Sequence, residues 1–157
     1  MPPSVLRRTS SHSSQLSYRT LFDRQIGTTI PTTLRSLLAV RAFGLRAVGD
    51  LDADHLDRAI SWVHNSDLPD PTPWLEPGQL LLTDGGQFTG PGSTSPEAYC
   101  FRLQQRGVAG LGFAIDVIHA AVPAELAAAC ERHEIPLIEV PGTTPFIGII
   151  RHVADAE

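Results

Sequence analysis

The sequence predicts an α/β domain in which a single, mostly parallel sheet is flanked by helices. Short apolar runs at residues 79–83, 108–115 and 137–140 have the length and the bounding glycines or prolines of buried strands. Helical patterns at residues 95–106 and 123–133 separate these runs. Alternation of strands and helices is typical of parallel strands joined by right-handed crossovers, which place helices on both faces of the sheet.

The elements on the amino-terminal side of these runs are shorter. Thr33 is a favourable N-cap, and leucines recur behind it at helical spacing. Residues 67–77 contain four prolines, so we expect a loop there with at most a helical turn near Trp74. The remaining expectations are a helix at 34–40, strands at 45–48 and 59–64, and a turn or short helix at 52–58.

The helices on the carboxyl-terminal side carry clear boundary signals. Ser95, Pro96 and Glu97 supply an N-cap, a first-turn proline and an acid near the positive end of the helix dipole. Gly107 suits the end of that helix, because glycine tolerates a left-handed backbone. Residues 145–156 carry the pattern of a final amphipathic helix.

Residues 1–30 differ from the rest of the chain in composition. They are rich in serine, threonine and arginine without apolar periodicity, so they cannot bury enough surface to offset the entropy of ordering. We expect a disordered N-terminal tail at 1–30 and a single folded domain at 31–157. The shortage of acids is similar to that of an organelle transit peptide, but an extended tail or a misplaced start codon explains it equally well.

Charge and hydropathy exclude several kinds of partner. Residues 31–157 hold eight arginines and sixteen acidic residues, and the chain contains no lysine. An acidic domain is poorly suited to neutralising phosphates, so we expect no direct nucleic-acid contact. No run reaches the roughly 18 apolar residues that span a bilayer, and we therefore expect a cytoplasmic protein without membrane contact.

Motifs for catalysis, cofactors and metals are absent from the sequence. It lacks a Gly-x-Ser-x-Gly elbow, a Cys-x-x-Cys pair, a His-Glu-x-x-His helix and a phosphate-loop ending. Cys100 and Cys130 lie thirty positions apart within helical patterns, which predicts no disulfide framework. His119 and His133 have no metal-ligand spacing with either cysteine and are expected at the surface. We expect no catalytic residue, no cofactor and no metal.

Several sequence blocks occur in a fixed order along the folded part. They are residues 60–71 (ISWVHNSDLPDP) with 74–75 (WL), 77–85 (PGQLLLTDG), 107–113 (GVAGLGF), and 135–141 (IPLIEVP) with 144–146 (TPF). In this order and spacing they resemble the N-terminal ligand-sensing domain of the PucR family of bacterial transcriptional regulators, named for the control of purine catabolism. The resemblance covers about residues 33–153.

The resemblance implies a non-enzymatic sensory domain that binds a small-molecule metabolite as its effector. In family members this domain precedes a dimerisation region and a DNA-binding helix-turn-helix, so we expect a homodimer in the full regulator. The chain contains neither part, which suits a fragment and a stand-alone sensor equally. It departs from the family pattern at Asp84 and Asp116, where small residues are usual, so the identity of the effector does not carry over.

Two aspartates follow predicted strands directly. Asp84 and Asp116 emerge at the same edge of the sheet if those strands are parallel neighbours, and small ligands of open α/β sheets settle at this carboxyl edge. We expect both carboxylates to accept hydrogen bonds from an N–H-rich or cationic molecule such as a ureide or a purine. Thr83, Gly85 and Gly86 would complete the rim. The alternative is that each aspartate caps the turn that follows it.

Further ligand contacts are expected near the proline-rich loop and at the strand ends. His64 can titrate near neutral pH, although a purely structural histidine explains the same pattern. Trp74 can stack on a planar heterocycle, whereas Trp62 is expected in the core. With these, the predicted ligand-binding set gains His64, Ser66, Asp70, Trp74 and Phe113.

Two other functions remain open from the sequence. One is a structural dimerisation module without a ligand, and the other is a small enzyme that acts on a ureide or purine catabolite. If an effector binds, the loops at 67–77 and 85–92 are the expected moving parts, and the final helix would transmit their change.

Overall fold

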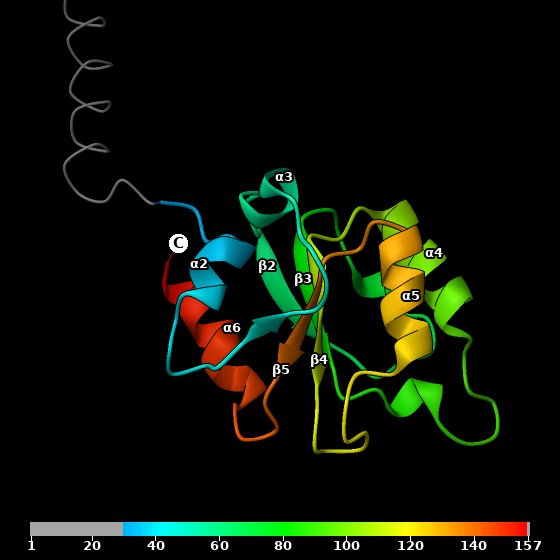
Figure 1. Ribbon diagram of the computed structural model, residues 1–157. Helices are drawn as coiled ribbons and strands as arrows, with labels where there is room; N and C mark the ends of the chain where they lie inside the picture. The colour runs from blue at the N-terminus through cyan, green and yellow to red at the C-terminus, as the bar shows by residue number, and fades with distance from the viewer. Residues whose placement is uncertain (1–29, 157) are drawn as a thin grey trace, which may run out of the picture. The chain divides into compact units, whose positions relative to one another are not determined.

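One five-stranded sheet organises the computed structural model, which describes residues 30–156 (Figure 1). The strand order is β1-β5-β4-β3-β2. The strands β2 to β5 pair in parallel, and β1 joins the β5 edge antiparallel, so the prediction of a single, mostly parallel sheet is confirmed. Of the tail predicted at residues 1–30, residues 1–29 lie outside the described residues. The strands are β1 (Arg46–Ala47), β2 (Trp62–Asn65), β3 (Gln79–Thr83), β4 (Gly110–Ala114) and β5 (Leu137–Val140).

The helices α2 and α4 begin at the expected capping residues, although α2 ends at Leu38 and not at the predicted residue 40. Thr33 Oγ1 accepts a hydrogen bond from Ser36 N at the start of α2. Ser95 Oγ does the same for Ala98 N at the start of α4, and Gly107, with φ 74°, ends that helix. The helices are α2 (Leu34–Leu38), α3 (Ala53–Leu56), α4 (Pro96–Arg106), α5 (Ala124–Arg132) and α6 (Phe146–Asp155), with the single turns η1 (Thr72–Trp74) and η2 (Gly86–Phe88).

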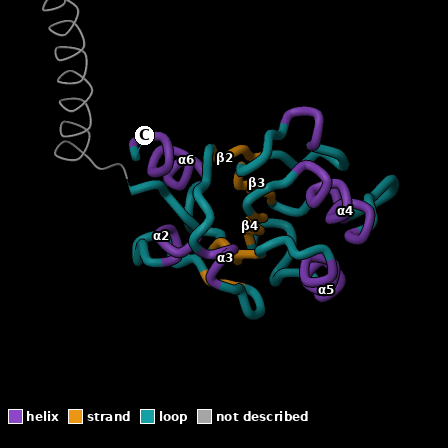
Figure 2. Tube along the Cα trace, turned by 90° about the horizontal axis from the view of Figure 1, so that it is seen from above, coloured by secondary structure: helices purple, strands orange, loops and turns teal. Residues whose placement is uncertain are grey.

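Helices cover both faces of the sheet. Figures 1 and 2 show α2 and α6 on one face and α4 and α5 on the other. Leu80 and Leu82 of β3 pack in the core beneath α2 and α6, whereas Leu81 packs in the core beneath α4 and α5. All three leucines are fully buried, which explains why the central strand is a continuous apolar run and shows no polar alternation.

Strands β2 and β4 are shorter than predicted. The strand expected at 59–64 begins only at Trp62, because Ile60 N donates to Thr32 O and Ser61 N donates to Gly78 O. The strand expected at 108–115 is limited to Gly110–Ala114. The turn η2 was not predicted; it follows Gly85, whose φ of 86° reverses the chain directly after β3.

The prediction that Trp62 packs in the core is wrong. Its side chain is 41% exposed, while the next residue, Val63, is 2% exposed. The reason is that β2 is the last strand of the sheet, where alternation turns Val63 into the core and Trp62 toward the opposite face.

The two ends of the sheet have different surroundings. The carboxyl ends of β2 to β5 meet the loops that contain Asp67, Asp84 and Asp116, whereas α3 lies at the opposite, amino end (Figure 1). Among the helices of residues 30–156, none has both the length and the hydropathy that crossing a bilayer requires.

Candidate functional site

A buried polar network holds the carboxyl edge of the sheet together. Thr83 is fully buried, and its hydroxyl donates to Asp67 Oδ1 at 2.8 Å. The same oxygen accepts from Gly85 N at 3.1 Å and from the Gln87 side-chain amide at 3.0 Å. Gln87 also donates to the Tyr99 hydroxyl at 3.1 Å. Burial raises the pKa of Tyr99, so its hydroxyl stays protonated at neutral pH.

Asp67 joins the ends of β2 and β3. Its Oδ1 accepts from the Thr83 hydroxyl and, at 2.9 Å, from Asp84 N. The register that pairs Asn65 with Leu82 brings these groups together, because it sets both strand ends level. The loop after β2 is therefore tied to the loop after β3 by one carboxylate oxygen.

Aromatic side chains close over Gly85. A Cβ at this position would lie 2.5 Å from the Phe113 ring and 2.8 Å from the His119 ring, so only glycine fits. His119 Nε2 lies 2.9 Å from Gly85 O, which makes it a partner of the loop after β3. His119, which was expected simply at the surface, is half-buried and bonded to this loop.

The predicted carboxylates lie at the predicted edge. The strands β3 and β4 are parallel neighbours, so Asp84 and Asp116 both follow carboxyl ends. Asp84 is half-buried, and desolvation together with the nearby Asp67 charge raises the pKa of its carboxyl group. Asp116 is exposed with a left-handed φ of 59°, and its backbone N donates to His119 O at 2.7 Å. Neither carboxylate accepts a hydrogen bond from the described residues, so turn capping by their side chains is not observed there.

The other predicted ligand contacts are divided between buried and exposed positions. Phe113 is fully buried, whereas Trp74, in η1, is 62% exposed. His64 is half-buried within β2. Ser66 Oγ accepts from Leu68 N at 3.1 Å. Asp70 Oδ1 accepts from the Thr72 hydroxyl, and this bond lowers the pKa of the Asp70 carboxyl group.

A cavity of about 490 Å³ opens at the same edge, on the face covered by α4 and α5. Its wall combines Phe88 and His119 with the first turns of both helices. The ring of Phe88 packs on Tyr99 and Phe113, so this wall rests directly on the buried network. The full lining is Phe88, Ser93, Thr94, Ser95, Pro96, His119, Pro123, Ala124 and Glu125, and it includes none of the residues predicted to contact a ligand.

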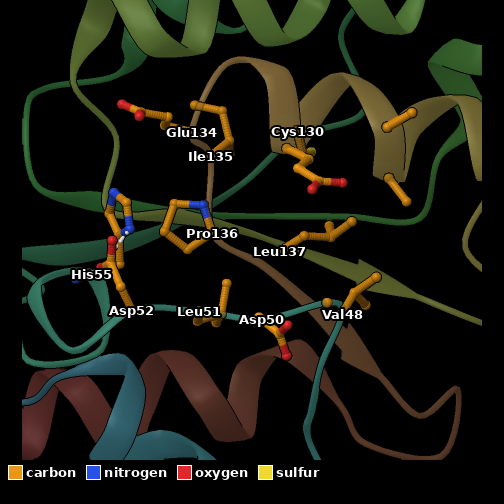
Figure 3. Close-up of a pocket in the computed structure, with 14 residues that line it drawn as sticks. Val48, Asp50, Leu51, Asp52, His55, Cys130, Glu134, Ile135, Pro136 and Leu137 are labelled. Carbon is orange, nitrogen blue, oxygen red and sulfur yellow. Dashed lines mark hydrogen bonds and ion pairs between the residues drawn. The ribbon is translucent and has the colours of Figure 1, made fainter.

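A second cavity, of about 530 Å³, lies at the amino end of β5 (Figure 3). It is bounded by the loop Val48–Asp52, by His55 of α3, by the last turns of α5 and by the connection into β5. Nothing in the sequence analysis pointed to this place, because it forms between segments more than seventy positions apart.

Comparison with known proteins identifies the family. Residues 36–156 match the sequence profile of PucR, the purine catabolism regulatory protein-like family. The chain belongs to the PucR family. It is also 30% identical over 125 residues to the transcriptional activator PmfR of Paenarthrobacter nicotinovorans. That match covers 79% of this chain but only 26% of PmfR, so the chain spans about a quarter of this relative's length. No solved structure matches the chain.

The PucR match covers every described element from Ser36 onward, including both cavities. Within residues 30–156, no cluster of three or more histidine, cysteine, aspartate or glutamate side chains is placed to hold a metal ion. In this PucR domain the cavity at the carboxyl edge is lined by Phe88, His119 and Glu125 among others, and the cavity at the amino end of β5 combines apolar side chains with several carboxylates.

Sequence reasoning missed three members of the carboxyl edge of this PucR domain: Asp67, Gln87 and His119. Asp67 carried a usable signal, because it follows a predicted strand closely, as Asp84 does. Gln87 and His119 carried none, since their roles depend on the turn η2 and on a loop thirty-four positions away.

Proposed function

We propose that residues 31–157 form the effector-sensing domain of a PucR-family transcriptional regulator, and that a small molecule binds at the carboxyl edge of the sheet. The single observation that carries the proposal is the joining, at one edge, of a cavity of about 490 Å³ to a buried polar network through Phe88 and His119. Cavities of roughly 300–1,000 Å³ suit metabolite-sized ligands.

The proposed effector is a neutral or cationic molecule rich in N–H groups, of the ureide or purine type. Asp84 supports this choice, because its half-buried carboxylate has no hydrogen-bond donor among the described residues. Asp84 does not line the cavity, so the proposed ligand extends from the cavity past His119 to the loop after β3. A ligand N–H group would supply that donor and would offset the cost of burying the charge. Asp116, which follows the next strand, is the second proposed acceptor. The name of the family, given for purine catabolism, is consistent with this class.

The proposed output is a change in conformation and not a reaction. A ligand that displaces His119 or Phe88 would disturb the bond to Gly85 O and the edge-to-face packing on Tyr99, and with them the network around Thr83. The same network holds the loop after β2 through Asp67. Ligand binding in the cavity would thus alter the loops after β2 and β3 together. The effector shifts the domain by binding one conformation of these loops better than the other.

The test is a thermal-shift and calorimetric screen of the 157-residue chain against the neutral molecules allantoin, xanthine and hypoxanthine, with the anions allantoate and urate as comparisons that should bind more weakly. A true effector at a hundredfold its dissociation constant adds about 2.7 kcal/mol to the free energy of unfolding. Ala124→Phe, which places a ring in the cavity from an exposed position at the start of α5, should abolish the shift without lowering the melting temperature of the free protein.

The double variant Asp84→Asn/Asp116→Asn tests the carboxylates separately. Affinity for the effector should fall about tenfold or more, because two charged acceptors become amides. The matched control, Asp54→Asn/Asp155→Asn, removes the same charge from exposed positions elsewhere. An effector that binds both double variants equally would remove the carboxylates from the proposal, and an effector that still binds Ala124→Phe would remove the cavity.

Dimerisation without a ligand is the second candidate function. It is favoured by two exposed tryptophans, Trp62 on the edge strand β2 and Trp74 in η1. A pure dimerisation module would show a melting temperature that rises with protein concentration and would not respond to the metabolite panel. Sedimentation velocity of the parent chain and of Trp62→Ser over a concentration series distinguishes this function from effector sensing.

A further inference from the structure

The cavity at the amino end of β5 is built on the opposite edge of the sheet from the proposed effector site. Val48 N donates to Leu137 O at 2.9 Å, which joins the loop after β1 to the start of β5 and closes one side. Figure 3 shows this loop on one side and residues 134–137 on the other, with Val48 and His55 at opposite ends. The antiparallel pairing of β1 with β5 therefore creates the cavity.

The floor of this cavity is apolar. Ile135 and Leu137 are buried, and Val48 and Leu51 are half-buried across from them. Apolar groups in a concave surface of this size stabilise a ligand that has a hydrocarbon or aryl body, because binding removes both apolar surfaces from water. The apolar lining consists of Val48, Leu51, Ala127, Ala128, Ile135, Pro136 and Leu137.

The charged groups around the floor are almost all negative. The lining contains the carboxylates of Asp50, Asp52, Glu131 and Glu134, and it contains no arginine. His55 is the one basic side chain of the lining, and its Nδ1 lies 2.9 Å from Asp52 Oδ1. Within residues 30–156, no salt bridge neutralises Asp50, Glu131 or Glu134.

The end of α5 adds to this negative potential. The helix Ala124–Arg132 ends at the cavity, so the negative end of its dipole lies beside Cys130 and Glu131. Glu134 follows with a left-handed φ of 55°, a conformation in which glycine is favoured at helix ends. The Glu134 carboxylate therefore lies at the margin of the cavity, at a backbone conformation that glycine adopts more easily than glutamate.

We propose that this cavity is a second ligand site, which binds an organic cation consisting of an ammonium group on an aryl or alkyl body. The body lies on the floor formed by Leu51, Ile135 and Leu137, and the ammonium group lies among the carboxylates at the end of α5. Hydrogen-bonded and charge-assisted contacts to carboxylates favour a cation over a neutral molecule of the same shape. The site is separate from the carboxyl edge and does not depend on the effector proposed there.

The test is calorimetric titration of the 157-residue chain with three probes of one shape and different charge: phenethylammonium, phenethyl alcohol and hydrocinnamate. Phenethylammonium should bind about tenfold or more tightly than the alcohol, and hydrocinnamate should not bind measurably. Two titrations of variants locate the site. Glu131→Gln/Glu134→Gln should bring the affinity for phenethylammonium close to that for the alcohol, and Ala128→Phe, from an exposed position of the lining, should abolish binding of both.

Matched controls separate the cavity from general electrostatic attraction. Glu76→Gln/Asp155→Asn removes the same charge from exposed positions outside both cavities and should leave the affinity for phenethylammonium within about twofold of the parent. A third variant, Asp84→Asn, tests whether phenethylammonium binds instead at the carboxyl edge of the sheet, where the proposed effector is also neutral or cationic. Thermal melting of each variant establishes that it is folded.

Four results would overturn the proposal. They are no binding of phenethylammonium to the folded parent, equal binding of the alcohol, equal weakening by the control double variant, and undiminished binding to Ala128→Phe. A loss of affinity in Asp84→Asn that matches the loss in Glu131→Gln/Glu134→Gln would assign the cation to the carboxyl edge instead.

Discussion

Thr83 shows how a single hydroxyl group can organise one edge of a sheet. It donates once, to Asp67, and accepts twice, from Gly85 N and the Gln87 amide, so its hydrogen-bonding capacity is satisfied inside the protein. The neighbouring residue, Asp84, lacks such partners among the described residues and is only half-buried. Adjacent residues therefore differ: the Thr83 hydroxyl is satisfied within the edge, and the Asp84 carboxylate accepts no bond from the described residues, which is why we propose it as a ligand contact.

The raised pKa of Asp84 predicts a stability change that depends on pH. Partial burial and the Asp67 charge favour the protonated carboxyl group in the native state. The native state therefore binds this proton more tightly than the unfolded chain, and ionisation of Asp84 opposes folding as the pH rises above the unfolded value of 3.8. Asp84→Asn should raise the urea midpoint at pH 7, and the gain should shrink as the pH falls toward 3.8.

Urea titrations of the parent and the variant at several pH values measure this difference. Asp155→Asn, which removes an exposed carboxylate at the end of α6, controls for the change in net charge. An equal gain from Asp155→Asn, or a gain independent of pH, would contradict the assignment to Asp84.

Gly85 and Gly90 allow the cost of a left-handed backbone to be distinguished from the cost of a steric clash. Gly85 and Gly90 have φ of 86° and 76°, but an added Cβ meets the Phe113 ring at 2.5 Å from Gly85 and meets nothing within 4 Å from Gly90. Gly90→Ala should cost about 1 kcal/mol of unfolding free energy, which is the cost of a left-handed alanine. Gly85→Ala should cost about 2 kcal/mol more, because the ring must move in a packed core. Chemical denaturation of both variants measures these losses of unfolding free energy. Equal losses would mean that the Phe113 ring moves aside without cost.

At the scale of elements, the contact between α4 and α5 contains a pair of thiols that the sequence spacing did not suggest. Cys100 Sγ and Cys130 Sγ lie 3.6 Å apart, and the two side chains are 0% and 2% exposed. Their mutual hydrogen bond and their burial raise the pKa of the Cys130 thiol. Both cysteines are free thiols in the structure.

This pair predicts that thiol labelling reports the opening of the α4–α5 layer. Only the thiolate reacts quickly, so a buried thiol of raised pKa should react with a disulfide reagent at least about 100-fold more slowly in the native protein than in urea. Stopped-flow labelling at pH 8 measures both rates. Cys100→Ser should react with a stoichiometry of one in urea. Rapid labelling of the native parent would mean that the two helices separate readily.

At the scale of the whole molecule, the two edges of the sheet differ in how they are built. The carboxyl edge is formed by loops between parallel strands, as is usual for open α/β sheets. The amino ends of the strands border a cavity, because one antiparallel strand, β1, extends the sheet beside β5. Under the two proposals made above, the domain would respond to two metabolites if both ligands shift the same conformational equilibrium.

The core of the described residues predicts where the chain can be shortened. Its buried apolar residues run from Leu34 to Val153, and the compact unit begins at Pro31. A chain that begins at Pro31 should therefore melt at the same temperature as the full chain. Thermal melting followed by circular dichroism measures this. A clear loss of stability would show that residues 1–30 contribute to the fold and would contradict the prediction of a disordered tail.

The sequence by itself determined those features that depend on local chemistry. The strands Gln79–Thr83 and Leu137–Val140 have the predicted bounds, because apolar runs between turn residues leave no other choice of ends. The start of α4 after Ser95 and its end at Gly107 follow from capping and from the backbone freedom of glycine. The order of these elements was enough to predict a parallel sheet with helices on both faces.

Only the tertiary structure decided what those elements bring together. The pairing of Asn65 with Leu82 places Asp67 against Thr83, and the pairing of Arg46 with Glu139 opens the cavity beneath α5. Strand register and strand order are long-range properties, which arise from how whole faces pack, so no local pattern contains them. For the same reason Trp62 is exposed: its sequence suits a core strand, but the strand lies at the edge of the sheet.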